Sequence, residues 1–246
     1  MGIPWSPLRL DLDQEHSPAI SGLAVAVIPT LNEEASIGAV VGGIPRDVVS
    51  PVIVADGGSR DATAARAREA GAIVIDVGPG YGRACLLATQ AAVDADIVVF
   101  MDGDGADDLA SISALIAPIR SGTADFVIGS RVRGIREAGS MSWHQVAAGL
   151  AAGFGIRLLY GVRYTDMGAF RAIRRDVLLN LGMREMTYGW NIEMQMRAAR
   201  ARLRVLEIPV PYHRRTGGAS KVAGSLRGTL RAGFRIVSTF MRVAFG

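Results

Sequence analysis

The stretch Ile97-Val-Val-Phe-Met-Asp-Gly-Asp104 decides the fold of this chain, because a short apolar run stops abruptly at two aspartates. Five consecutive apolar residues, three of them β-branched, are typical of a strand that is buried on both faces. We therefore predict a central strand of a parallel sheet over residues 97–101. Asp102 and Asp104 then lie just beyond its carboxyl end.

Three apolar runs upstream have the same character, at residues 23–28, 51–55 and 72–77. Helical segments follow them, the first from Glu33 with Asn32 as its N-cap, the second from Asp61 to Ala70 and the third from a glycine loop to about Val93. Strands and helices that alternate at this spacing predict an α/β fold with a mostly parallel, doubly wound sheet flanked by helices.

The second half of the chain is less regular. Residues 125–130 and 204–210 resemble two more strands, an apolar helix covers residues 143–160, and residues 188–193 lead into another helix. We expect no transmembrane helix, because the apolar stretch at 146–160 is short and interrupted by glycines and Arg157. We expect no signal peptide either, since the N-terminus lacks an apolar core.

Basic charge is concentrated at the C-terminal end. The net charge is +4, and seven basic residues but no acidic one follow Glu207. Such an end predicts an anionic partner: phosphate, a membrane surface or nucleic acid. A nucleic-acid binder would leave acidic strand ends unexplained, so we expect no nucleic acid. The single cysteine, Cys85, excludes a disulfide framework.

Polar, turn-forming segments follow three of the predicted strands, at residues 29–33, 56–61 and 102–108. Ligands of parallel sheets bind beyond the carboxyl ends of the strands. Carboxylates at Asp102 and Asp104 suit a hard divalent cation that bridges diphosphate oxygens. The alternative is a solvated acidic turn, because Asp and Gly are common turn formers.

Two glycine-containing loops accompany this acidic loop. Asp56, at the start of Asp-Gly-Gly-Ser, could accept a hydrogen bond from a nucleoside base or a ribose hydroxyl. The loop at residues 78–82 lacks the spacing of a dinucleotide fingerprint, which argues against a dehydrogenase. A nucleotidyltransferase is also disfavoured, because no glycine- and lysine/arginine-rich loop follows the first predicted strand.

Taken in order, these motifs resemble those of family 2 glycosyltransferases. Residues 27–34 (VIPTLNEE), 54–63 (VADGGSRDAT) and 102–104 are similar to the successive donor-site motifs of that family. Residues 129–131, 166–171 and 214–221 are similar to the second half of its polyprenyl-phosphate sugar transferases, the dolichyl-phosphate mannosyltransferase-like branch. The resemblance covers residues 24–225.

The resemblance implies a GT-A fold, an inverting displacement and a Mg²⁺ or Mn²⁺ cofactor held by Asp102 and Asp104. The nucleotide-sugar site it implies consists of Pro29, Asn32, Glu33, Asp56, Gly80, Asp102, Gly103 and Asp104. Phosphates of the donor or the acceptor would face Arg131, Arg214, Arg215, Ser220 and Lys221. The catalytic candidates are Asp104, Arg131, Asp166 and Glu193.

The chain departs from the family pattern in two places. Asp-Gly-Gly-Ser at residues 56–59 replaces the usual Asp-Asp-Gly-Ser, which removes one carboxylate. The loop at residues 102–106 lacks the glutamine of the common Asp-Ala-Asp-Leu-Gln, which puts one metal or phosphate contact in doubt. The Gln-x-x-Arg-Trp motif of processive synthases is absent, so we expect no polymerase.

The acceptor decides the mechanism. A phosphate is already ionised near neutral pH and needs cations rather than a base, and the basic residues of the second half suit a polyprenyl phosphate. A soluble hydroxyl acceptor would need a general base, for which Asp166 or Glu193 are the candidates. Glu193 has an alternative interpretation, as an i,i+4 partner of Arg197 on a helix.

The organisation we expect has three parts. Residues 1–22 form a flexible tail, residues 23–215 a GT-A glycosyltransferase domain, and residues 216–246 a basic amphipathic segment. Apolar residues from Leu230 to Phe245 recur at helical spacing beside arginines, which suits either an anionic bilayer or packing on the domain. We therefore expect a cytoplasmic protein, with peripheral contact at the inner face of the membrane.

Overall fold

The computed structural model describes residues 22–217 and 226–246, the side chains of residues 226–231 excepted. The predicted tail therefore lies outside the described residues apart from Gly22, and so do Ser220 and Lys221.

The described residues form one seven-stranded sheet. Its strands are β1 (Ala24–Thr30), β2 (Val52–Asp56), β3 (Ile73–Asp76), β4 (Ile97–Phe100), β5 (Phe126–Ser130), β6 (Arg171–Arg174) and β7 (Val205–Pro209). The spatial order is β3-β2-β1-β4-β6-β5-β7, and every pairing is parallel except the two made by β6. The prediction of a mostly parallel sheet is confirmed.

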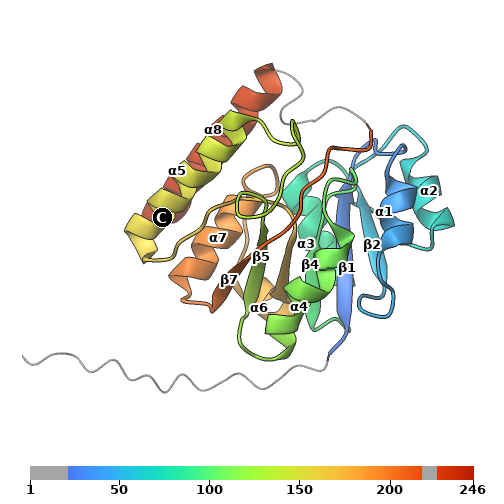
Figure 1. Cartoon of the computed structure of the whole chain (residues 1–246), viewed down its shortest axis with the longest axis horizontal. Helices are drawn as coiled ribbons and strands as arrows, with labels where there is room; N and C mark the ends of the chain where they lie inside the picture. Colours follow the sequence, from blue (N-terminus) through green and yellow to red (C-terminus); the bar gives the residue numbers. More distant parts are fainter. Residues whose placement is uncertain (1–21, 218–225) are drawn as a thin grey trace, which may run out of the picture.

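Helices cover both faces of the sheet (Figure 1). They are α1 (Ile37–Gly43), α2 (Thr63–Glu69), α3 (Tyr81–Ala91), the 3₁₀ turn η1 (Leu109–Ser111), α4 (Ile112–Arg120), α5 (Trp143–Tyr160), α6 (Arg175–Asn180), α7 (Trp190–Arg200) and α8 (Leu226–Phe245). On one face lie α3, α6 and α7, with α5 and α8 packed outside α7, and on the other lie α1, α2 and α4.

The central strand β1 explains why the predicted strands read as unbroken apolar runs. Val25 and Val27 point into the core under α3 and α7, whereas Ala26 and Ile28 point into the core under α1 and α4. A strand covered on both faces has no solvent-facing side, so every position is apolar. The same holds for β4, which pairs with β1 in parallel and delivers Asp102 to the carboxyl edge of the sheet.

Two elements differ from the sequence-based expectation. The helix expected at Glu33 begins at Ile37, because Asn32 adopts a left-handed φ of 51° and its Oδ1 accepts a hydrogen bond from the Arg60 backbone N–H instead of capping a helix. The antiparallel strand β6 was not predicted, because its sequence Arg-Ala-Ile-Arg does not resemble a buried strand. Arg171 is nevertheless fully buried.

Arg171 holds β6 to the loops around it. Its guanidinium donates to the Gly168 and Asn191 carbonyl oxygens and lies 5.7 Å from the centre of the Phe126 ring. Burial lowers the pKa of Arg171, so its charge is held there at a desolvation cost.

Replacing Arg171 by alanine should destabilise the fold, because it leaves a cavity and removes the hydrogen bonds to the Gly168 and Asn191 carbonyl oxygens. We expect a loss of about 2–4 kcal/mol in the free energy of unfolding, measured by urea denaturation. Arg68→Ala, on the exposed side of α2, is the control and should change that value by less than about 0.5 kcal/mol. Equal effects of the two substitutions would contradict a structural role for Arg171.

Candidate functional site

A cavity of about 500 Å³ opens at the carboxyl edge of the sheet, where β1, β2 and β4 end. The loop after β4, the N-terminus of α3 and the segment before α7 complete its wall. The lining residues are Pro29, Thr30, Leu31, Glu33, Gly57, Pro79, Gly80, Tyr81, Ala84, Asp102, Gly103, Asp104, Thr187, Tyr188 and Arg215. This is the edge at which parallel sheets bind ligands.

The acidic loop after β4 is held rigidly by its own hydrogen bonds. The Asp102 backbone N–H donates to Asp107 Oδ2 at 2.9 Å, and Asp104 Oδ1 accepts from the Ala106 backbone N–H at 2.9 Å. Ser36 Oγ donates to the Gly103 carbonyl oxygen at 2.7 Å. A side chain at Gly103 would lie 2.8 Å from Thr30 Cγ2, so only glycine lets the loop approach β1 this closely.

The carboxylates of this loop repel one another. Burial, with the charge of Asp104 as the next cause, raises the pKa of Asp102 to about 6. Burial and the charge of Asp102 raise the pKa of Asp107 to about 8. A cation placed among these groups would relieve both causes, since it compensates for lost water and screens like charges.

The residues present fit a divalent cation that is shared with a ligand. Asp104 Oδ2 is buried and, although Arg215 pairs with it ionically, it accepts no hydrogen bond of good geometry from the described residues, so it keeps a lone pair to offer. No group of three or more His, Cys, Asp and Glu side chains in the described part of the chain is arranged to hold a metal by itself. Two carboxylates completed by phosphate oxygens and water are the usual environment of Mg²⁺.

Residues 213–216, which we call the basic strap, cross this acidic loop. The Thr216 backbone N–H donates to the Asp104 carbonyl oxygen at 3.0 Å, and the His213 N–H donates to the Ala106 carbonyl oxygen at 2.9 Å. These bonds place Arg215 Nη2 2.9 Å from Asp104 Oδ2, as an ion pair. Arg215 lines the cavity, so the strap brings a cation to the place where the carboxylates converge.

The glycine loop before α3 forms the opposite wall. A side chain at Gly80 would lie 2.7 Å from the Met186 carbonyl oxygen, and Gly80 adopts a φ of 129°. The Arg83 backbone N–H donates to that same Met186 oxygen at 3.0 Å. The glycine thus allows the start of α3 to pack against the backbone that carries Thr187 and Tyr188.

The cavity contains most of the residues predicted for nucleotide-sugar binding. Pro29, Glu33, Gly80, Asp102, Gly103 and Asp104 line it. Asn32 and Asp56 do not, because their side chains organise the neighbouring loops. Asn32 Oδ1 accepts from the Arg60 backbone N–H, and the Asp56 carboxylate accepts from the backbone N–H and hydroxyl of Ser59.

Sequence reasoning did not assign Tyr81, Thr187 and Tyr188 to the site, although all three line the cavity. Tyr188 begins a stretch that the sequence marked only as the approach to a helix. Its place at the cavity follows from the contact between that stretch and the glycine loop, which the sequence does not encode locally.

Arg131 and Asp166, two of the catalytic candidates, are bound to each other. Asp166 Oδ2 accepts from the backbone N–H and Nε of Arg131, and Oδ1 lies 2.7 Å from Arg131 Nη2. The hydrogen bonds and charge of Arg131 hold the pKa of Asp166 below its ordinary value against the opposing effect of burial. Arg131 also lies 4.9 Å from the centre of the Tyr212 ring. Neither residue lines the cavity.

Glu193, the second candidate base, is fully buried on α7. Its Oε2 accepts from the backbone N–H groups of Arg184 and Glu185 at 3.0 and 2.6 Å, and its Oε1 pairs with Arg197 Nε at 2.9 Å. The predicted i,i+4 contact with Arg197 is therefore confirmed. Glu193 does not line the cavity, and its bonds anchor α7 to the segment before it.

Arg214 belongs to the strap but does not line the cavity. Its Nε donates to the Ala138 carbonyl oxygen, and its backbone N–H donates to Glu137 Oε2. The structure brings one of the predicted phosphate-binding residues, Arg215, to the acidic loop. The placement of Ser220 and Lys221 lies outside the described residues.

Comparisons with known proteins agree with this geometry. Residues 25–182 match the family described as Glycosyl transferase family 2. An uncharacterized glycosyltransferase of Mycobacterium tuberculosis is 38% identical, over 87% of this chain and 96% of its own length. The undecaprenyl-phosphate mannosyltransferase of Micrococcus luteus is 30% identical, over 83% of this chain and 89% of its own.

Among solved structures, the chain is similar to glucosyl-3-phosphoglycerate synthase from Mycobacterium tuberculosis in complex with phosphoglyceric acid. The TM-score is 0.71 at 25% sequence identity, and the match covers 91% of this chain and 80% of that one. The predicted GT-A fold is thereby confirmed.

The raised pKa values of the acidic loop predict a pH-dependent stability. Asp107 keeps its proton up to about pH 8 in the native state, whereas an unfolded aspartate loses it near 3.8. Unfolding therefore releases a proton between these values, and the free energy of unfolding falls by up to about 1.4 kcal/mol per pH unit as the pH rises through that window.

Asp107→Asn should remove most of this dependence, because an amide oxygen still accepts the Asp102 N–H but carries no charge. We expect the variant to melt roughly 2–4 °C or more above the unsubstituted protein at pH 8 and close to it at pH 4, by metal-free scanning calorimetry. Asp108→Asn, next in the loop, is the control. An unchanged pH slope in Asp107→Asn would show that Asp107 is not the titrating group.

Proposed function

This chain belongs to glycosyl transferase family 2. We propose that it transfers the sugar of a UDP-sugar or GDP-sugar donor to the phosphate of a polyprenyl lipid, with inversion at the anomeric carbon. The observation that carries the proposal is the junction of Asp102, Asp104 and Arg215 at the edge of the cavity. Charges of both signs meet there, as recognition of a cation-bound diphosphate requires.

The donor half of the proposal rests on the cavity. Its glycine-lined walls allow the backbone to approach a nucleoside closely, and Pro29, Glu33 and Gly57 lie at the ends of β1 and β2. Asp102 and Asp104 would hold Mg²⁺ or Mn²⁺, which when bound neutralises charge that develops on the departing nucleoside diphosphate. Arg215, an ion-pair partner of Asp104, is placed to exchange that carboxylate for a phosphate oxygen.

The choice of a phosphate acceptor rests on the hydrogen bonds and ion pairs that already engage the two candidate bases. Asp166 and Glu193 are both engaged by arginine and by backbone N–H groups, and neither lines the cavity. Asp166 in addition has a lowered pKa, which makes it a weak proton acceptor. A phosphate acceptor needs no such base, because its ionised oxygen can attack the anomeric carbon directly.

The transfer forms one bond and breaks one bond at the anomeric carbon. A bond forms between the acceptor phosphate oxygen and the anomeric carbon, while the bond from that carbon to the donor β-phosphate oxygen breaks. The electron pair leaves with the nucleoside diphosphate, and no proton has to be transferred. The 30% identity with an undecaprenyl-phosphate mannosyltransferase supports this choice of acceptor.

A soluble hydroxyl acceptor is the second candidate. The similarity to a synthase crystallised with phosphoglyceric acid favours it. That reaction would need a base to take the hydroxyl proton, and Asp166 or Glu193 would first have to leave their ion pairs. In the described structure Glu33 is the other carboxylate that lines the cavity beside the aspartates of the acidic loop.

The enzyme would act at a membrane surface. We assign residues 23–215 to the glycosyltransferase domain and residues 216–246 to a basic segment that acts at the cytoplasmic face of the membrane. No helix in the described part of the chain has the length and apolar character needed to cross a membrane.

Asp104→Ala should weaken cation-dependent donor binding. We expect the affinity for UDP or GDP in the presence of Mn²⁺ to fall at least about tenfold, measured by titration calorimetry, because one of two carboxylate ligands is lost. Asp108→Ala is the matched control, since Asp108 belongs to the same loop but bonds Ser111 and does not line the cavity. Unchanged binding by Asp104→Ala would refute the site.

The acceptor is tested with radiolabelled nucleotide sugars and undecaprenyl phosphate in detergent, with Mn²⁺. We expect one donor to produce label that partitions into the organic phase. The parallel reaction with 3-phosphoglycerate should leave the label in the unreacted donor. Label on the soluble acceptor together with none in the lipid would replace our proposal by the second candidate.

A further inference from the structure

The outer layer formed by α5 and α8 exposes an unusual amount of apolar surface. Nine of the 16 exposed large apolar side chains in the described residues belong to these two helices. In Figure 1 the pair lies at one end of the molecule, beyond α7 and far from α1 and α2. The two helices contact each other, since a side chain at Gly155 would lie 2.7 Å from the Phe240 ring.

Helix α8 is apolar on both of its sides. Ala232, Thr239 and Val243 are buried on the side facing the domain. Phe234, Val237, Met241 and Phe245 recur at helical spacing on the outside, and Phe234 and Phe245 are 73% and 75% exposed. Packing against α7 therefore explains the inner side of the helix and leaves the outer one without a partner in the described chain.

Helix α5 has the same property. It is well defined locally, with a capping box between Ser142 and Gln145 at its start and left-handed Gly161 at its end. Its exposed side carries Trp143, Phe154 and Leu158, which are 82%, 61% and 72% exposed. We call these three residues, with Phe234, Val237, Met241 and Phe245, the α5/α8 face.

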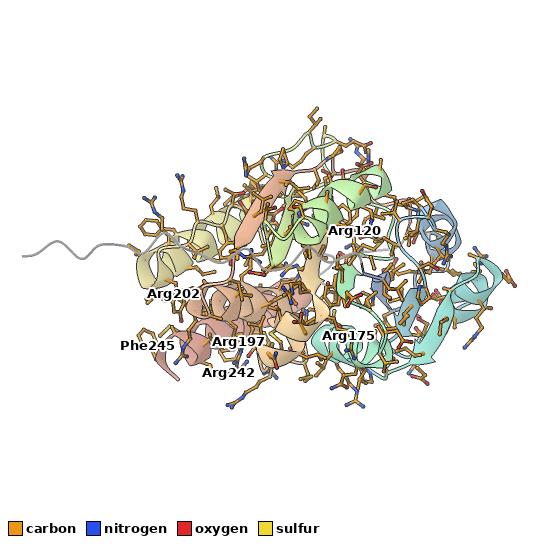
Figure 2. All side chains as sticks on the ribbon, turned by 90° about the horizontal axis from the view of Figure 1, so that it is seen from below. Arg120, Arg175, Arg197, Arg202, Arg242 and Phe245 are labelled. Carbon is orange, nitrogen blue, oxygen red and sulfur yellow. The ribbon has the colours of Figure 1, made fainter. Side chains whose placement is uncertain are left out.

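The ionised side chains carried by these two helices are all basic. Neither helix contains Asp or Glu, whereas α5 contains Arg157 and α8 contains four arginines. Arg157 and Arg235 are exposed, and Arg242 is partly exposed although it pairs with Glu185. Figure 2 shows Arg242 and Phe245 together at the end of the molecule where Arg197 also lies.

This combination distinguishes between two possible occupants. A second copy of the chain would cover the apolar side chains, but it would bring two sets of arginines together without an acidic residue on either helix. An anionic bilayer covers the apolar side chains and also supplies phosphates, with about 1 kcal/mol for each arginine near the surface. Trp143 at the start of α5 suits the interface between head groups and acyl chains.

We propose that the α5/α8 face binds directly to an anionic lipid bilayer. Its aromatic and aliphatic side chains enter the boundary of the acyl chains, and Arg157 and Arg235 lie at the level of the lipid phosphates. The role of this surface rests on the proposed function, because the surface would hold the enzyme at the membrane that carries the polyprenyl phosphate acceptor. Binding itself requires neither donor nor acceptor.

The face is joined to the donor cavity by short contacts. Thr239 Oγ1 donates to Glu185 Oε2 at 3.0 Å, and Arg242 Nη2 lies 3.2 Å from the same oxygen. Glu185 is two residues from Thr187, which lines the cavity. Docking through α8 would therefore hold the wall of the donor cavity at a constant position relative to the membrane.

The test is flotation of the full chain with vesicles, without acceptor. We expect the protein to float with vesicles of phosphatidylcholine mixed with phosphatidylglycerol, and to remain largely unbound with phosphatidylcholine alone. The double variant Phe154→Ser/Phe234→Ser should bind the mixed vesicles at least about tenfold more weakly. Arg235→Gln should reduce the preference for the anionic vesicles.

The matched control is Ile73→Ser/Val93→Ser, which replaces two exposed apolar side chains away from the α5/α8 face and should bind as the unsubstituted chain does. Thermal unfolding followed by circular dichroism in every variant verifies that each one is folded, whether or not it binds a donor. Failure of the unsubstituted chain to float, or equal flotation of the Phe154→Ser/Phe234→Ser variant, would overturn the proposal.

Analytical ultracentrifugation in the same buffer tests whether a second copy of the chain binds to the α5/α8 face instead. A dimer that Phe154→Ser/Phe234→Ser converts to a monomer, with no vesicle binding by either protein, would make the face a contact between copies. The lipid-acceptor reaction in detergent is scored separately, so loss of docking and loss of transfer activity remain distinguishable.

Discussion

The carboxylates of Asp102, Asp104 and Asp107 are crowded at the end of a strand that is buried on both faces, and their mutual repulsion constrains the whole site. Burial and like charge raise the pKa values of Asp102 and Asp107. The loop keeps its shape because Ser36 and the Asp102 and Ala106 N–H groups bind it from inside, and because Arg215 approaches Asp104 from the strap. A ligand that brings a cation and phosphates would offset both the burial and the repulsion of these carboxylates.

The other acidic residues that seemed suited to catalysis stabilise the scaffold. Asp166 joins the end of β5 to the segment before β6 through Arg131. Glu193 pairs with Arg197 within α7 and joins that helix to the preceding segment through the backbone N–H groups of Arg184 and Glu185. Their engagement favours an acceptor that arrives ionised. The cavity and the α5/α8 face are linked through Glu185, so the part of the chain that would meet lipid is continuous with the part that would bind the donor.

Local sequence patterns were sufficient for the parallel strands and for the acidic loop. Residues 97–101 are apolar because both sides of β4 are covered. An aspartate directly after such a strand must lie at the carboxyl edge of the sheet. The same patterns were insufficient for β6, whose arginines conceal a buried strand, and for the first helix, whose expected cap Asn32 binds Arg60 instead. Both exceptions depend on partners distant in the chain.

The sequence by itself determined the family, the parallel strands of the first half and the position of Asp102 and Asp104, because hydrophobic periodicity and turn residues act over a few neighbours. Only the tertiary structure decided which carboxylates are engaged. Asp166 meets Arg131 across 35 residues, and Arg215 reaches Asp104 from the far end of the chain. It also decided that α8 covers α7 with one apolar side and exposes another, since the amphipathic pattern of a helix does not specify which side faces the domain.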